Sequence, residues 1–306
     1  MSYMLSGKIP MQHANTYIRS AVVFSIVALT FALTTFFRNG IWKNDIFLWD
    51  DAAAKSPNDG KVLANLGTAW MNVGRNDIAR AYFEKSKSIK PYWNTAFLFL
   101  GDIYLIEGKS DEAEKEFRAA LSRYKHDTGA LLRIAMLDIE KGRLQEALDG
   151  TNHILRLDER FPDAYMVQGM IYAKMKMPED AERSLEKALA LSPDHPRILL
   201  NLGIVKFEAG KYSEAEACLS TIGRFGPLWA EANLWLGRTY YGSGRYAKSV
   251  EVFERYLSLK PRDNNARLEL ALAYEKAGLH DKALDENKKY LAVISAERKS
   301  EDRLKK

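Results

Sequence analysis

The chain has 306 residues, of which 47% are hydrophobic and 28% charged, and its formal net charge is +5. This composition can bury a sizeable core, which excludes a disordered or low-complexity chain. Residues 1–43 hold four basic and no acidic residues, so they carry +4 of the charge and leave the rest nearly neutral. Because nucleic-acid binding needs a clustered basic face, we expect no nucleic-acid partner.

Residues 20–37 form an apolar segment, SAVVFSIVALTFALTTFF, without a charged residue. As a helix rising about 1.5 Å per residue it would span roughly 27 Å, close to the roughly 30 Å hydrocarbon core of a bilayer. Three interpretations compete: a cleaved signal peptide, a retained anchor, and the last span of a protein with several spans. The segment ends Thr-Thr-Phe-Phe without a small-residue cleavage site, which favours a retained single-pass anchor in the lipid bilayer.

The flanks of this segment carry equal positive charge, so the positive-inside rule leaves its orientation open. Lys8 and Arg19 precede the segment, and Arg38 and Lys43 follow it. A short amino terminus without acidic residues usually stays in the cytoplasm. We therefore expect the rest of the chain on the non-cytoplasmic side, periplasmic or lumenal, and keep a cytoplasmic placement as the alternative.

Prolines set the register of an internal repeat. Spacings of 34 residues, or of 102, which is three times 34, separate Pro57, Pro91, Pro193, Pro227 and Pro261. This period predicts seven two-helix units over residues 60–293, with starts at 60, 94, 128, 162, 196, 230 and 264. The other predicted segments are a tail (1–19), a junction with a partial repeat helix (38–59) and a charged helix end (294–306).

Three columns of small residues recur in this frame. The first is small in every unit: Ala79, Ala113, Ala147, Ala181, Ala215, Ser249 and Ala283. The second is glycine or alanine: Gly67, Gly101, Ala135, Gly169, Gly203, Gly237 and Ala271. Bulky side chains in these two columns would push helices apart, so we expect the paired helices to approach closely there. The third column ends the first helix with a glycine suited to a left-handed conformation: Gly74, Gly108, Gly142, Gly210, Gly244 and Gly278.

Leucines and aromatic residues fill the remaining core columns, and one unit cannot cover its own apolar face, so the units must stack. Units three and four depart most from the pattern, because Thr151 stands where others have Phe or Leu and Lys176 stands where others have glycine. We expect the fastest amide exchange, apart from the termini, between about residues 125 and 180.

The second unit shows the complete pattern as Leu100, Gly101, Tyr104, Ala113, Phe117 and Ala120. This pattern closely resembles the tetratricopeptide repeat family over residues 60–293. The resemblance implies an all-α fold whose antiparallel helix pairs wind into a right-handed superhelical solenoid with a concave groove. It also implies binding of other proteins or peptide segments.

The junction ahead of the repeats resembles a narrower family through Arg38-Asn39, Trp42, Leu48-Trp49-Asp50 and Lys55-Ser56-Pro57. These residues are similar to the passage from the last membrane span into the repeats of the transmembrane-and-tetratricopeptide family, the protein O-mannosyltransferase-like proteins and their bacterial relatives. In that family an upstream multi-span region holds the glycosyl-transfer machinery. The resemblance therefore implies a chain with the repeat half and without the catalytic half.

No catalytic, cofactor-binding or metal-binding pattern stands out. Cys218 is the only cysteine, and the five histidines lack the i, i+4 spacing that directs two imidazoles at one metal. Nucleophile-elbow and zinc-protease motifs are also missing from the sequence. We therefore expect no enzyme, no cofactor and no metal.

First-helix positions that packing does not require would line the groove. The predicted partner-binding residues are Leu98, Phe99, Asp102, Leu105, Ile106, Arg133, Met136, Met166, Met170, Asn201, Ile204, Phe207, Trp235, Arg238 and Tyr241. This strip is unusually apolar, and methionines let such a surface repack around different partners. We predict a membrane-anchored scaffold that binds apolar or amphipathic segments of partners. The alternative is a non-catalytic subunit that holds the substrate of a membrane glycosyltransferase or an envelope-assembly complex.

Overall fold

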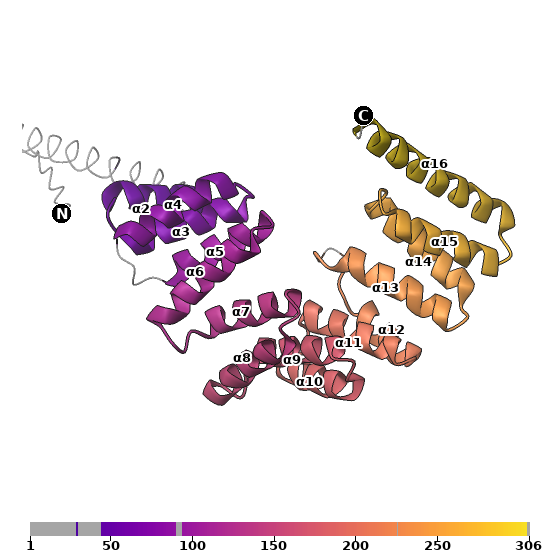
Figure 1. The fold of residues 1–306 in the computed structure, drawn as a ribbon, viewed down its shortest axis with the longest axis horizontal. Helices are drawn as coiled ribbons and strands as arrows, with labels where there is room; N and C mark the ends of the chain where they lie inside the picture. Colours follow the sequence, from indigo (N-terminus) through magenta and orange to yellow (C-terminus); the bar gives the residue numbers. More distant parts are fainter. Residues whose placement is uncertain (1–28, 30–43, 90–93, 225, 305–306) are drawn as a thin grey trace, which may run out of the picture. The chain divides into compact units, whose positions relative to one another are not determined.

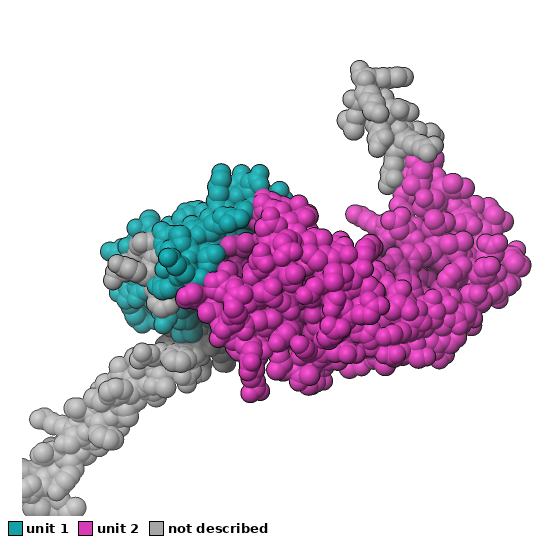
Figure 2. Space-filling model, turned by 60° about the horizontal axis from the view of Figure 1, so that its bottom comes forward, with its two compact units in different colours: residues 1–125 teal, residues 126–306 magenta. Residues whose placement is uncertain are grey.

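The computed structural model describes residue 29 and residues 44–89, 94–224 and 226–304. These residues form fifteen helices and no strand, which confirms the all-α prediction (Figure 1). The chain divides into two compact units, residues 1–125 and 126–306, coloured separately in Figure 2.

The first unit contains helices α2 to α6. They span Asp45–Lys55 (α2), Gly60–Asn72 (α3), Asn76–Ile89 (α4), Asn94–Ile106 (α5) and Ser110–Arg123 (α6). Helix α3 pairs with α4 and α5 pairs with α6, while α4 also packs against α5. The core between the helices is fully buried at Leu66, Phe83, Leu100 and Phe117.

The second unit contains helices α7 to α16. They span Thr128–Glu140 (α7), Leu144–Leu157 (α8), Pro162–Lys174 (α9), Pro178–Leu191 (α10), Pro196–Glu208 (α11), Tyr212–Ser220 (α12), Trp229–Gly242 (α13), Tyr246–Leu259 (α14), Asn264–Lys276 (α15) and His280–Leu304 (α16). Each odd-numbered helix pairs with the even-numbered helix that follows it. Each odd-numbered helix from α9 to α15 also packs against the even-numbered helix before it, so the pairs stack in chain order (Figure 1).

Local capping fixes where several helices begin. The Asp127 carboxylate accepts a hydrogen bond from the Ala130 backbone N–H at 2.8 Å, and Asp263 accepts one from Ala266 at 3.0 Å. These bonds satisfy backbone donors that a helix start leaves free. Helices α9, α10 and α11 begin at a proline, whose missing N–H costs nothing at that position.

Glycines close the turns inside the pairs. All six predicted glycines adopt a positive φ between 72° and 78°. At Gly244 the backbone N–H donates to the Tyr241 carbonyl at 3.0 Å, and the Arg245 N–H donates to the Tyr240 carbonyl at 2.8 Å. Lys176 takes the same place with a φ of 61°, a conformation that side chains disfavour. The predicted left-handed glycine turn is confirmed, and the turn between α9 and α10 forms without a glycine.

The second glycine column lies where the paired helices meet. A Cβ atom on Gly101 would lie 2.2 Å from Cε1 of Phe117, and one on Gly237 would lie 2.7 Å from Cδ1 of Phe253. No side chain fits at these distances unless the aromatic ring moves. The predicted close approach is confirmed.

In the part of the chain that the structure describes, no helix combines the length and the apolar character required to cross a membrane. The predicted anchor at residues 20–37 lies outside the described residues, apart from Leu29.

Candidate partner-binding surface

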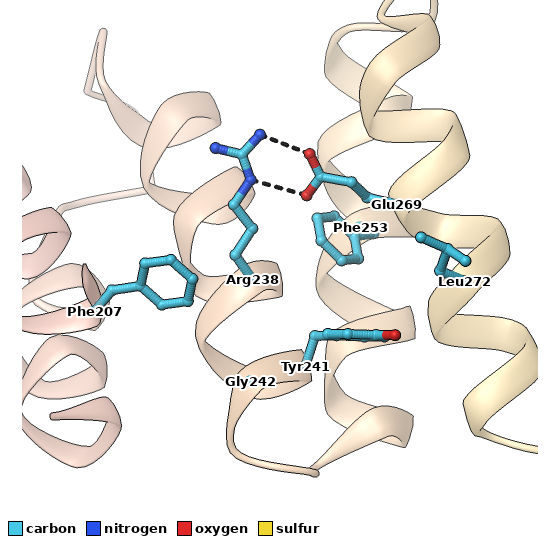
Figure 3. A pocket seen from close by; sticks show the side chains of 7 residues that line it. All are labelled: Phe207, Arg238, Tyr241, Gly242, Phe253, Glu269 and Leu272. Atoms are coloured by element: carbon cyan, nitrogen blue, oxygen red, sulfur yellow. Dashed lines mark hydrogen bonds and ion pairs between the residues drawn. The ribbon is translucent and has the colours of Figure 1, made fainter. Parts of the chain in front are cut away.

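An apolar hollow lies on helices α11 and α13 to α15 of the second unit (Figure 3). Its volume is about 280 Å³, and its lining residues come from α11, α13, α14 and α15: Phe207, Arg238, Tyr241, Gly242, Phe253, Glu269 and Leu272. Phe253 is buried, whereas Leu272 is 45% exposed. The lining of the hollow therefore includes a buried aromatic ring as well as a side chain that reaches the solvent, and it comes from several helices.

Ring contacts hold the aromatic walls of this hollow. Phe207 packs edge-to-face on Trp235 with a ring separation of 5.5 Å and also meets Tyr212 at 5.9 Å. Tyr241 packs edge-to-face on Tyr246 at 5.5 Å. Because Phe207 and Tyr241 each rest on a second ring, these two walls of the hollow are held in place without a ligand, as in most ligand pockets.

Two charged side chains in the lining bind each other. The Arg238 guanidinium donates two hydrogen bonds to the Glu269 carboxylate, at 2.8 and 2.6 Å, as the dashed lines in Figure 3 mark. These hydrogen bonds raise the pKa of Arg238, whose guanidinium also lies 4.5 Å from the centre of the Trp235 ring. Each charge is compensated, so the open part of the hollow favours an apolar group over an ion.

A second hollow, of about 530 Å³, lies between α9 and α11. Three predicted site residues line it: Met170, Asn201 and Ile204. Lys174, Lys176 and Glu208 belong to the same lining, so this hollow is more polar than the first. Together the two hollows contain six of the predicted residues, because Phe207, Arg238 and Tyr241 line the first.

Five predicted residues lie on α5 in the first unit. Leu98, Phe99, Asp102 and Leu105 are partly buried, and Ile106 is 63% exposed. Phe99 stacks on Phe83 of α4 with a ring separation of 5.5 Å, so part of its surface serves packing. Trp235 is in a similar position in the second unit, since it packs against a core cluster and against Phe207.

Met166 is a correction to the predicted site. It is 3% exposed and belongs to the core cluster of α7 to α11, so its side chain does not reach the surface. Met166 and Met170 are one turn apart on the same face of α9, but the neighbouring helices cover Met166, whereas Met170 lines the second hollow. Arg133 and Met136 of α7 are partly buried.

The sequence prediction missed four lining residues of the first hollow, Gly242, Phe253, Glu269 and Leu272, of which the last two lie on α15. Glu269 stands 34 residues after Trp235, and Leu272 stands 34 residues after Arg238. The same columns in the seventh unit contain both residues, but the prediction stopped at the sixth unit.

The described residues contain no group of three or more histidine, cysteine, aspartate or glutamate side chains placed to hold a metal ion. His126 Nδ1 and His153 Nε2 lie 3.2 Å apart, a contact between residues 27 positions apart that the sequence spacing did not indicate.

Comparison with known proteins places the repeats in context. Models described as tetratricopeptide repeat match residues 104–171, 172–233 and 234–297. The chain is similar to protein O-mannosyl-transferase TMTC3 of Homo sapiens, with 26% identity over 211 residues, 64% of this chain and 23% of that protein. It is similar to protein O-mannosyl-transferase TMTC1 of Homo sapiens, with 25% identity over 204 residues, 65% of this chain and 23% of that protein.

The chain thus spans less than a quarter of the length of these curated relatives. Their names match the family suggested by the junction residues, and that resemblance is confirmed for the repeat part. Among solved structures, the chain is similar to the APC/C hetero-tetramer Cut9-Hcn1, with a TM-score of 0.70 and 18% identity, covering 74% of this chain and 45% of that one. At this identity the similarity concerns the fold alone.

Proposed function

Because the chain belongs to the tetratricopeptide repeat family, we propose that it is a non-catalytic scaffold that binds apolar or amphipathic segments of partner proteins. The observation that carries this proposal is the hollow lined by Phe207, Tyr241 and Leu272. Its volume of about 280 Å³ suits one large apolar side chain of a peptide rather than a complete small-molecule ligand. Aromatic anchors in such pockets commonly dominate binding at protein interfaces.

The charges of the site support a peptide partner. Arg238 and Glu269 bind each other, and a partner that inserts an apolar side chain would not have to separate them. Leu272 at the margin is 45% exposed, so it can contact the partner without a change in the fold. Within the second unit the predicted residues of α7, α9 and α11 extend the proposed surface, with Met166 left out. The predicted residues of α5 are proposed as a separate surface of the first unit.

A peptide-display selection on the full chain tests this proposal. We expect enriched peptides to share one large aromatic or aliphatic residue, and their binding to fall at least tenfold in Leu272→Glu, equivalent to about 1.4 kcal/mol. The matched control is Leu157→Glu, since Leu157 is equally exposed, at 44%, but lies at the end of α8. Equal binding by the two variants would remove the hollow from the proposal.

We also propose the domain organisation outlined by the sequence, with residues 20–37 as a single-pass anchor and residues 60–293 as the seven repeat units on the non-cytoplasmic side. The apolar run without a charged residue supports the anchor. Protease added to sealed vesicles or spheroplasts should digest the repeats of the wild-type chain. Protection until the membrane is opened would reverse the orientation.

A second candidate function is a subunit that holds the substrate of a membrane glycosyltransferase or an envelope-assembly complex. The relatives named protein O-mannosyl-transferases favour it, because they are longer proteins that contain a region similar to this chain. Crosslinking in native membranes distinguishes the two functions. Recovery of a multi-span transferase would support the second candidate, and recovery of a mixed set of envelope proteins would support the general scaffold.

A further inference from the structure

Helix α16 exposes two leucines on one face. Leu284 is 55% exposed and Leu291 is 62% exposed. The two residues are seven positions apart, which places them on the same side of a helix, two turns from each other. Lys288 stands between them on that side and is exposed. We call Leu284, Lys288 and Leu291 the α16 face.

The same positions on α14 are covered. Val250 and Leu257 stand 34 residues before Leu284 and Leu291, yet they are only 6% and 9% exposed. The covering helix is α15, which packs against α14 and joins these two residues in one core cluster through Leu270 and Tyr274. An apolar pair at these positions therefore forms a surface on which another helix packs in this fold. We call such a surface a helix seat.

Helix α8 provides a second example. Leu148 stands at the same position of its repeat as Val250, and it packs against a core cluster that includes residues of α9, the helix that follows. Among the three described helices with this apolar pair, α8, α14 and α16, only the α16 face is largely exposed to solvent.

The centre of the apolar pair on α14 also holds a polar contact. On α14 the central residue is Glu254, whose carboxylate accepts a hydrogen bond from the Tyr274 hydroxyl of the covering helix. On α16 the corresponding residue is Lys288, 34 positions later. An ammonium group donates hydrogen bonds only, so a helix on this face must supply an acceptor, and a carboxylate forms the strongest bond.

We propose that the α16 face binds an amphipathic helix of a partner protein, seated as α15 is on α14, with an aspartate or glutamate of the partner facing Lys288. This surface is separate from the apolar hollow, so the proposal stands independently of the proposed function.

A second copy of the chain fits this face poorly. A symmetric pair would lay two α16 helices antiparallel, with Leu284 of each copy against Leu291 of the other. Lys288 stands midway between these leucines, so the two lysines would meet near the symmetry axis. Like charges in that arrangement oppose the pairing.

The test uses the full chain and a labelled, side-chain-crosslinked helical peptide that copies residues 264–277, the helix that already covers the equivalent seat. Three versions carry tyrosine, glutamate or lysine at the position of Tyr274. Fluorescence anisotropy should show the glutamate peptide binding at least threefold more tightly than the lysine peptide, the size expected of an exposed ion pair worth about 0.7 kcal/mol. Lys288→Glu should reverse that order.

The leucines are tested with the double variant Leu284→Asp and Leu291→Asp, which should weaken peptide binding at least tenfold. The control is Leu157→Asp, at a leucine of α8 that is 44% exposed, which should leave binding unchanged. Circular dichroism should give the same helical signal for all variants, because both α16 leucines are exposed.

Four results would overturn the proposal. The first is failure of every peptide to bind the wild-type chain, and the second is a lysine peptide that binds as tightly as the glutamate peptide. The third is self-association of the wild-type chain in sedimentation that the double variant abolishes, since that result would assign the face to a second copy. A lower helical signal in the double variant would show that the chain itself covers these leucines, and would overturn the proposal as well.

Discussion

The helix pairs α7–α8 and α13–α14 fill the same position of the repeat with different side chains. In α13–α14 the ring of Phe253 lies against Gly237, at a distance that leaves no room for a Cβ atom. In α7–α8 the corresponding residues are Thr151 and Ala135, both buried. At this position α13–α14 combines a large aromatic residue with glycine, and α7–α8 combines two residues of moderate size.

Both residue pairs are buried, so this position of the repeat stays packed although the residues that fill it differ. In α13–α14 the packing of one large ring against a glycine accounts for much of the contact between the two helices. Thr151 contributes less apolar area, and its hydroxyl donates to the Leu148 carbonyl of its own helix at 2.9 Å. The two pairs should therefore differ in their sensitivity to mutation.

Truncation of the second-helix residue should show the largest difference. Phe253→Ala removes a fully buried ring and should lower the free energy of unfolding by about 3–5 kcal/mol. Thr151→Ala removes one local hydrogen bond and should lower it by about 1 kcal/mol. Urea unfolding followed by circular dichroism measures both, and equal losses would contradict the comparison.

Alanine at two mid-helix glycines should act with opposite sign. Gly237→Ala places a Cβ atom 2.7 Å from the Phe253 ring, and the resulting strain of about 1–3 kcal/mol exceeds the roughly 1 kcal/mol gain in helix propensity. Gly150→Ala meets its nearest atom, the Ala135 Cβ, at an ordinary 3.7 Å, so it should stabilise the chain by up to about 1 kcal/mol. Thermal melting of the two variants provides the measurement, and shifts in the same direction would refute the packing argument.

The turns between paired helices allow two opposite substitutions to be compared at the same position of the repeat. Lys176 adopts a φ of 61° and Gly142 a φ of 75° at the same position of the repeat. Lys176→Gly should raise stability by about 1 kcal/mol, and Gly142→Ala should lower it by a similar amount, because a left-handed conformation costs side chains roughly 1–2 kcal/mol. No atom lies within 4 Å of a Cβ on Gly142, so this effect comes from the backbone alone. Opposite changes in the urea midpoint would support this account, and no change in either variant would exclude it.

The smallest expected effect is a difference in local opening. Units with weaker stacking open more often, so amide protons between about residues 125 and 180 should exchange faster than those of α13 and α14. Hydrogen exchange followed by mass spectrometry, with the termini excluded, measures this directly. Uniform protection across the array would count against a weak centre.

The glycine turns were predictable from sequence because one requirement, a left-handed backbone, selects one residue at a fixed spacing. Close helix approach at Gly101 and Gly237 was predictable in a similar way, because a tight contact selects small residues at a fixed spacing. Surface residues were harder to assign. Met166 and Met170 stand one turn apart on α9, and only the packing of the neighbouring helices decides that the first is in the core and the second lines a hollow.

Two buried charges illustrate the same limit. Lys206 and Asp138 occupy the column in which Tyr104, Tyr240 and Tyr274 stand, and they are 6% and 3% exposed. Lys206 Nζ lies 2.8, 3.3 and 2.6 Å from carboxylate oxygens of three glutamates on α10 and α12, namely Glu182, Glu186 and Glu214. Burial lowers the pKa of Lys206, but its hydrogen bonds outweigh that effect and raise the pKa above its usual value.

The sequence by itself determined the helical repeat, its 34-residue frame and its glycine turns, because each depends on residues that are close in the chain or recur at a fixed spacing. The tertiary structure alone decided which apolar side chains form the hollow, and which helix face stays uncovered. It also decided that Lys206 can be buried, since its acceptors come from helices before and after its own. These properties depend on distances between side chains of different helices, and the position of a residue in the repeat does not determine those distances.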